Sequence, residues 1–175
     1  MEFAFFYEYY PDLAMHETRS MEIAADDDNV PIGHYGYCEM FCADPACDCR
    51  RVILNVTDED FNTVAMIGYG WENEYFYKKW FGSDYFTRED VRNFMGPVHH
   101  NGNAESEYAD FFLNYFKTAL VNDTEYIKRI KKHYRMVKNL QKNRQFIKRR
   151  QQEAVKITEA ASFIAPFSGA EHKTS

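Results

Sequence analysis

The chain has 175 residues, 45% of them hydrophobic and 17% aromatic, which is enough for one folded domain and short for two. Fifteen Phe and thirteen Tyr supply large areas for burial, so the composition excludes a disordered chain. The formal net charge is −6. No apolar stretch approaches the roughly 20 residues of a membrane-spanning helix, and the apolar N-terminus lacks the basic region of a signal peptide. We therefore expect a cytoplasmic protein with no membrane contact and with reduced cysteines.

The N-terminal half has the sequence pattern of β-strands. Residues 3–10 alternate along the chain and predict a strand, whereas residues 11–29 lack a periodic pattern. Residues 51–57 and 62–69 are rich in β-branched side chains and are separated by a short acidic turn. This arrangement predicts a β-hairpin.

The C-terminal half has the pattern of helices. The aromatic stretch 71–86 is compatible with a short strand or a turn of helix. Residues 87–96 open with Thr-Arg-Glu-Asp, which resembles a capping box, and end at a Gly-Pro pair, so they predict a short helix. Apolar residues over 108–120 recur with the spacing of one helix face. A long final helix begins at Asp123 or Thr124.

All four cysteines fall within twelve residues, at Cys38, Cys42, Cys47 and Cys49. Four thiolates at about 2.3 Å from one centre form a tetrahedral zinc site. A helical turn over residues 38–42 would place the first two thiols on one face. The Asp-Pro pair that follows would reverse the chain, and the last two thiols would point the same way from an extended segment. We expect these four cysteines to bind one structural zinc ion that stabilises the loop.

The C-x3-C-x4-C-x-C spacing differs from that of common two-knuckle zinc fingers, so the assignment rests on clustering. An iron–sulfur cluster and reduced or redox-active thiols without metal are the alternatives. Two disulfides are disfavoured in the cytoplasm and would be strained at this spacing. His34 is a further candidate that would replace one cysteine in the metal shell or lie outside it.

Strands precede helices, which favours an α+β fold. We expect a small antiparallel sheet in the N-terminal half that carries the metal loop with its four cysteines. The sheet would pack against C-terminal helices, including one long basic helix. Residues 1–165 would form a single zinc-stabilised α+β domain, and residues 166–175 a flexible C-terminal tail.

Residues 126–150 carry eleven Lys and Arg and no acid, although the chain as a whole is acidic. This asymmetry predicts either an anionic partner, such as the phosphates of a nucleic acid, or pairing with the acidic remainder of the chain or a second subunit. The candidate contacts for nucleic acid or a partner are Lys128, Arg129, Lys131, Lys132, Arg135, Lys138 and Lys142.

His99 and His100 are adjacent, and such histidines can act as acid and base, so a hydrolase or transferase is an alternative function. The aromatic stretch 71–86 is either core or a stacking surface. The chain has no Gly-rich phosphate loop, no G-x-S-x-G elbow and no H-E-x-x-H motif, which weighs against an enzyme. The leading hypothesis is a zinc-stabilised cytoplasmic binding or adaptor domain. Its long helix would contact an unknown protein partner or a second copy, with nucleic-acid binding as the alternative.

Overall fold

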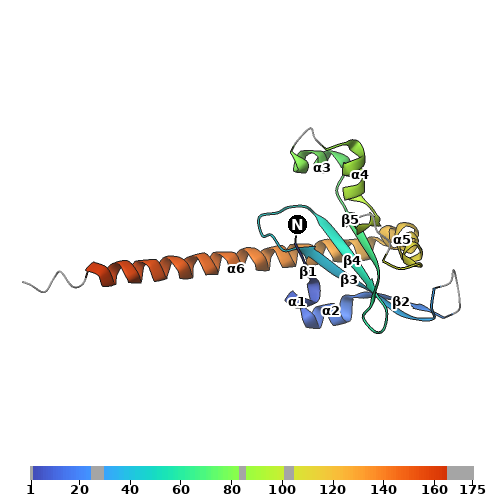
Figure 1. Ribbon diagram of the computed structural model, residues 1–175, viewed down its shortest axis with the longest axis horizontal. Coiled ribbons are helices and arrows are strands. Elements are labelled where there is room, and N and C mark those ends of the chain that lie inside the picture. The colour runs from blue at the N-terminus through green and yellow to red at the C-terminus, as the bar shows by residue number, and fades with distance from the viewer. Residues whose placement is uncertain (1, 25–29, 83–85, 101–104, 165–175) are drawn as a thin grey trace, which may run out of the picture.

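The computed structural model describes residues 2–24, 30–82, 86–100 and 105–164. Its centre is an antiparallel sheet in the order β1-β3-β4-β5-β6, with β2 also paired to β3 (Figure 1). The strands are β1 (Phe3–Phe5), β2 (Arg19–Ile23), β3 (Gly33–Cys42), β4 (Arg51–Thr57), β5 (Thr63–Gly70) and β6 (Val98–His99). The helices are α1 (Phe6–Tyr9), α2 (Pro11–Glu17), α3 (Glu74–Phe81), α4 (Arg88–Met95), α5 (Ala109–Thr118), the 3-10 turn η2 (Leu120–Asn122) and α6 (Thr124–Ile164). The predicted α+β class is confirmed.

The first two strands lie along the same edge of β3, separated by a helical excursion. Ala4 pairs with Phe41, and Met21 pairs with Tyr35. β1 and β2 therefore occupy the place of a single strand that α1 and α2 interrupt. The strand predicted over residues 3–10 is therefore wrong after Phe5. The Phe5 N–H donates to the Glu8 carboxylate at 2.9 Å, and Pro11 begins α2, where a missing N–H costs nothing.

The β4–β5 hairpin is confirmed. Leu54 pairs with Ile67, and every residue of β4 is buried. The Asp58 carboxylate accepts the N–H groups of Asp60 and Asn62, which closes the acidic turn. β4 lies between β3 and β5 in the sheet, and Arg51 at its start pairs with Gly70 of β5.

One face of the sheet packs against α5 and α6. Tyr37 contacts Phe112 of α5, and Phe41 contacts Tyr134 of α6. The α6 helix begins where predicted, with the Asp123 carboxylate accepting the Tyr126 N–H at 3.0 Å. Its side chains are exposed from residue 142 to residue 149, and Figure 1 shows the helix running on past the sheet.

The opposite face of the sheet receives the helical hairpin α3–α4. The aromatic stretch after Trp71 is therefore helical, and the side chain of Asn73 caps α3 by accepting the Phe76 N–H. The predicted capping box of α4 is confirmed, because Thr87 and Asp90 exchange hydrogen bonds.

The core is one cluster of buried side chains from the sheet, α1, α2, α5 and α6. Within the described residues, no helix combines the length and the apolar character needed to cross a membrane. The flexible tail predicted over residues 166–175 lies outside the described residues.

Candidate metal centre and neighbouring sites

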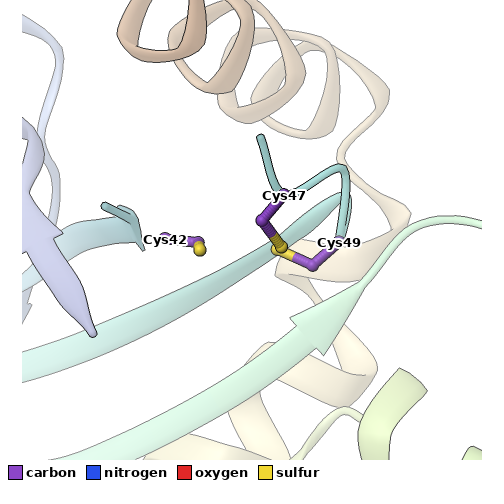
Figure 2. Close-up of side chains that lie close together, drawn as sticks. All are labelled: Cys42, Cys47 and Cys49. Atoms are coloured by element: carbon purple, nitrogen blue, oxygen red, sulfur yellow. The ribbon is translucent and has the colours of Figure 1, made fainter. Parts of the chain in front are cut away.

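Three of the four cysteines converge. The sulfur atoms of Cys42, Cys47 and Cys49 all lie within 4.8 Å of one another. Cys42 is the last residue of β3, and the other two lie in the loop that leads to β4 (Figure 2). Cys42 and Cys49 are fully buried, while Cys47 is half-buried. These three side chains form the cysteine cluster.

Cys38 is not part of this cluster. The helical turn expected over residues 38–42 is wrong, because both cysteines lie on β3, whose residues pair with β4. Four residues of strand separate them by about 13 Å. His34 lies further along the same strand with an exposed side chain, and it is not in the group either. The i, i+4 spacing fits a helix face, but the alternation of buried residues along this segment is that of a strand.

The loop between β3 and β4 is shaped by its own polar groups. The Asp44 carboxylate accepts the Ala46 N–H at 2.8 Å, and the Asp44 carbonyl accepts the Cys47 N–H at 3.2 Å. Arg50 has a φ of 45°, a left-handed conformation that is strained for a residue with a side chain. The two hydrogen bonds to Asp44 reverse the chain, so that Cys47 and Cys49 lie near Cys42.

The side chain and the carbonyl of Arg50 connect the loop to α3 and the residues before it. The guanidinium of Arg50 forms ion pairs with Asp48 at 3.0 Å and Glu72 at 3.2 Å, and it stacks on the Phe76 ring. The carbonyl of Arg50 accepts the Tyr77 hydroxyl at 2.8 Å. The loop is thus tied to a helix far away in sequence.

The α6 helix holds the loop from the other side. The Lys138 ammonium donates to the carbonyls of Cys42 at 2.9 Å and Asp44 at 2.7 Å, and the Gln141 amide donates to the Cys42 carbonyl at 3.2 Å. Lys138 is buried. A buried ammonium beside Cys42 favours the ionised form of that thiol, as metal binding requires.

The three thiols share protons unequally. Hydrogen bonding from the Cys49 thiol, aided by the Asp44 backbone and the Lys138 charge, lowers the pKa of Cys42 to about 5. That same hydrogen bond, together with burial, raises the pKa of Cys49, and burial raises the pKa of Cys47. The low pKa favours a thiolate at Cys42, and a metal ion would replace the protons of the other two thiols.

The cluster has the donor set of a soft-metal site. Thiolates select zinc, copper(I) or iron–sulfur clusters over calcium and magnesium. Among the described residues, three potential metal ligands converge here, and all three are cysteines. A tetrahedral ion would therefore take its fourth ligand from elsewhere.

The basic segment is confined to α6, and its cations differ in their surroundings. Lys128 pairs with Glu125 at 2.7 Å, and Lys132 with Glu17 at 3.7 Å. Lys138 was a candidate partner contact, but its ammonium is buried against the cysteine loop and does not form a contact surface. The other candidates from the basic segment are half-buried or exposed, namely Arg129, Lys131, Arg135 and Lys142.

His99 and His100 line a cavity of about 600 Å³. The His99 Nε2 atom lies 2.7 Å from the Asp110 carboxylate, which comes from α5. The enzymatic alternative needs histidines at a concave surface, and this requirement is met. The described residues that line the cavity include no Ser, Thr or Cys nucleophile.

The aromatic stretch divides between core and cavity. Tyr77 is fully buried, and Trp71 packs against Tyr134 of α6. Phe81 and Phe86 stack at 4.2 Å and line the cavity beside the histidines. Tyr85 lies outside the described residues.

Sequence reasoning missed Arg51, which belongs to the cavity and is buried. A signal was present, because Arg51 opens a strand that apart from Asn55 is apolar or β-branched, a pattern typical of a buried strand, where an arginine is uncommon. It missed the role of Lys138 for a different reason, since nothing in a run of eleven basic residues singles one out.

No family model, no curated protein and no solved structure matches the chain, so its function is argued from this geometry alone.

Proposed function

We propose that this chain is a zinc-stabilised binding domain, in which Cys42, Cys47 and Cys49 hold one zinc ion with a structural role. The convergence of three thiols within 4.8 Å carries the proposal. The hydrogen bond from Cys49 and the charge of Lys138 lower the pKa of Cys42, which favours the ionised sulfur that a metal ion binds. Zinc replaces the protons of the thiols with short bonds to sulfur.

The surroundings of the cysteines favour a structural ion over a catalytic one. Cys42 and Cys49 are fully buried, so reactants have little access to the sulfur atoms. The loop that bears them joins β3 to β4 and contacts both α3 and α6. A metal ion here would lock these four elements together, and its binding energy would act as folding energy.

The test is metal content and stability of the untagged chain, purified without chelator. We expect about one zinc per chain by mass spectrometry, and a lower melting temperature after a strong chelator is added. Iron in place of zinc would indicate an iron–sulfur cluster. Four titratable thiols and no metal would overturn the proposal.

The four cysteines supply a matched set of variants. Cys42→Ser, Cys47→Ser and Cys49→Ser should each lose most of the bound zinc, whereas Cys38→Ser should retain it. Cys38 lies on the same strand as Cys42 and is half-buried, so it controls for general effects of a Cys-to-Ser change. Equal zinc loss in Cys38→Ser would contradict the three-cysteine site.

A second candidate function is contact with an anionic partner, a nucleic acid in particular, through the part of α6 beyond residue 141. The observation that favours it is the exposure of residues 142–149, which include Lys142, Arg144, Lys148 and Arg149. These cations lie on the part of α6 that runs past the sheet (Figure 1). Cations that bind phosphates release counterions, so such binding would weaken steeply with salt.

A further inference from the structure

The cavity beside His99 and His100 is assembled from five elements. Its walls come from the start of β4, from the α3–α4 hairpin, from β6 with the residue after it, and from α5. Its volume of about 600 Å³ is in the range of small-molecule sites. Three phenylalanine rings form an apolar wall, where Phe81 packs against Phe86 at 4.2 Å and against Phe94 at 5.0 Å.

Arg51 supplies the unusual feature of this cavity. Its side chain lines the cavity, yet the residue is only 7% exposed. Across the part of the chain that the structure describes, its guanidinium has no carboxylate partner, and its Nε atom has no hydrogen-bond acceptor. A buried cation without an anion is costly, and buried polar groups in proteins are nearly always satisfied.

The fold reserves space for this guanidinium. Ile53, two residues after Arg51, pairs with Gly68 on β5, and a Cβ atom at Gly68 would collide with the Arg51 guanidinium. The Phe94 ring covers the guanidinium from the other side, with its centroid 4.4 Å from Cζ. A glycine beneath and an aromatic ring above fix the orientation of the cation.

The two histidines add further unsatisfied atoms. The Nδ1 atoms of His99 and His100 are buried and have no hydrogen-bond partner among the described residues. Burial, together with the charge of Arg51, lowers the pKa of His100, so its imidazole is neutral at pH 7 and can donate or accept one hydrogen bond. Lys117, exposed on α5, adds a second cation at the rim.

Two acids near the cavity are already engaged, and a third, Glu105, acts by its charge on His100. Asp90 accepts hydrogen bonds from the Thr87 backbone and hydroxyl in the α4 capping box, and Asp110 pairs with His99. Neither pairs with Arg51. The cavity therefore combines an apolar wall, an unpaired buried cation and unsatisfied imidazole nitrogens.

We propose that this cavity binds a small molecule that carries an oxyanion, a carboxylate or a phosphate, on a planar apolar body. The oxyanion accepts hydrogen bonds from the Arg51 guanidinium, and the apolar body packs against Phe81, Phe86 and Phe94. Arginine suits this task because its planar fork donates two parallel hydrogen bonds to such groups.

The cysteine cluster offers a competing role for Arg51, since an ionised Cys49 would interact with the Arg51 guanidinium by its charge. Lys138 already places an ammonium beside Cys42, and the Arg51 guanidinium lies against Phe94 on the side of the α3–α4 hairpin. The proposed ligand site therefore does not require the metal. The experiment separates the two roles by measuring zinc content alongside ligand binding.

The test is calorimetric titration of the full chain, in a buffer free of phosphate and carboxylates, with benzoate, phenyl phosphate, inorganic phosphate and neutral benzamide. We expect benzoate or phenyl phosphate to bind at least tenfold more tightly than benzamide, and more tightly than inorganic phosphate. Whichever of the two binds more tightly identifies the oxyanion. Equal binding of benzamide and both aryl anions would overturn the proposal.

Two variants locate the site. Arg51→Gln should lose the tenfold advantage of the anions, retain its zinc and unfold at an equal or higher temperature, because it removes an uncompensated buried charge. Gly68→Ala retains the guanidinium but displaces it, and it should lose the same advantage. Anion binding that is unchanged in both variants would overturn the proposal. So would zinc loss in Arg51→Gln accompanied by unchanged anion binding in Gly68→Ala.

Discussion

His133 shows how single polar side chains orient the longest helix. The residue is 1% exposed, and its two ring nitrogens lie 2.7 Å from the Glu39 carboxylate and 2.8 Å from that of Glu17. Its ring stacks on Phe6 at 4.0 Å. One side chain of α6 therefore contacts α1, α2 and β3. This contact fixes both the rotation and the position of the helix.

Replacing His133 with Ala should lower the free energy of unfolding by about 3–5 kcal/mol, since it leaves the buried Glu39 carboxylate without a partner. Urea denaturation measures this change. The control is Lys132→Ala, which removes an exposed partner of Glu17 and should cost at most about 1 kcal/mol. A double variant, His133→Gln with Glu39→Gln, should recover part of the loss. Equal costs for the His133 and Lys132 variants would contradict this interpretation.

At the scale of residues, the sequence predicted the candidate metal site where residues of one reactive type lie close together in the chain. Four cysteines in twelve residues pointed to a cluster, and three of them form it. The sequence could not show that Cys38 lies apart, because that depends on whether residues 38–42 are helix or strand. The sequence could not show the role of His133 either, because its partners come from positions 94 and 116 residues away.

Among the elements, local patterns with a clear start or end were predictable. The β4–β5 hairpin and the capped helix α4 follow from turn and capping chemistry within a few residues. The extent of the N-terminal strand was not predictable, because alternation over residues 3–10 does not show that the Glu8 carboxylate accepts the Phe5 N–H and so ends β1 after three residues. This strand pairs only with the end of β3, and the chain then leaves the sheet as α1.

Gly70 links the β4–β5 hairpin to the loop between β3 and β4 through Tyr77. A Cβ atom at Gly70 would collide with the Tyr77 hydroxyl, which donates to the Arg50 carbonyl. Gly70→Ala should therefore displace Tyr77, lower the free energy of unfolding by about 1–3 kcal/mol and weaken zinc retention against a chelator.

The matched control for this change is Gly36→Ala on β3, where a Cβ atom would meet its nearest neighbours at an ordinary 3.9 Å. That variant should be neutral or gain up to about 1 kcal/mol, because alanine restricts the unfolded chain. Urea denaturation of both variants makes the comparison. Equal effects would show that Tyr77 does not depend on the space at Gly70.

At the scale of the whole molecule, α6 has two parts with different roles. Up to Gln141 it is anchored to the sheet by apolar residues and by three buried polar side chains, His133, Lys138 and Gln141. From residue 142 to residue 149 its side chains are exposed. Charge alone could not reveal this division, because basic residues continue through both parts. The exposed part is therefore where we expect contact with a partner.

This division predicts how binding to a generic single-stranded RNA responds to salt. Neutralising Lys142, Arg144, Lys148 and Arg149 with glutamine should lower the slope of log K against log salt by up to about three, at about 0.7 per phosphate contact. Neutralising Lys128 and Lys132 should change it little, since Glu125 and Glu17 already pair with them. Fluorescence anisotropy over a salt series measures both slopes.

Measurements on the unmodified chain distinguish two partners of the exposed part of α6, a nucleic acid and a second copy of the chain. A phosphate backbone needs only cations along the helix, so its binding at low salt does not depend on which face they occupy. A second copy of the chain would instead bury the exposed part of α6 against itself, and light scattering would then report a dimer whether or not RNA is present. RNA binding at low salt by a monomer supports the nucleic-acid function. A dimer that binds no RNA at low salt removes that function and assigns the exposed part of α6 to self-association.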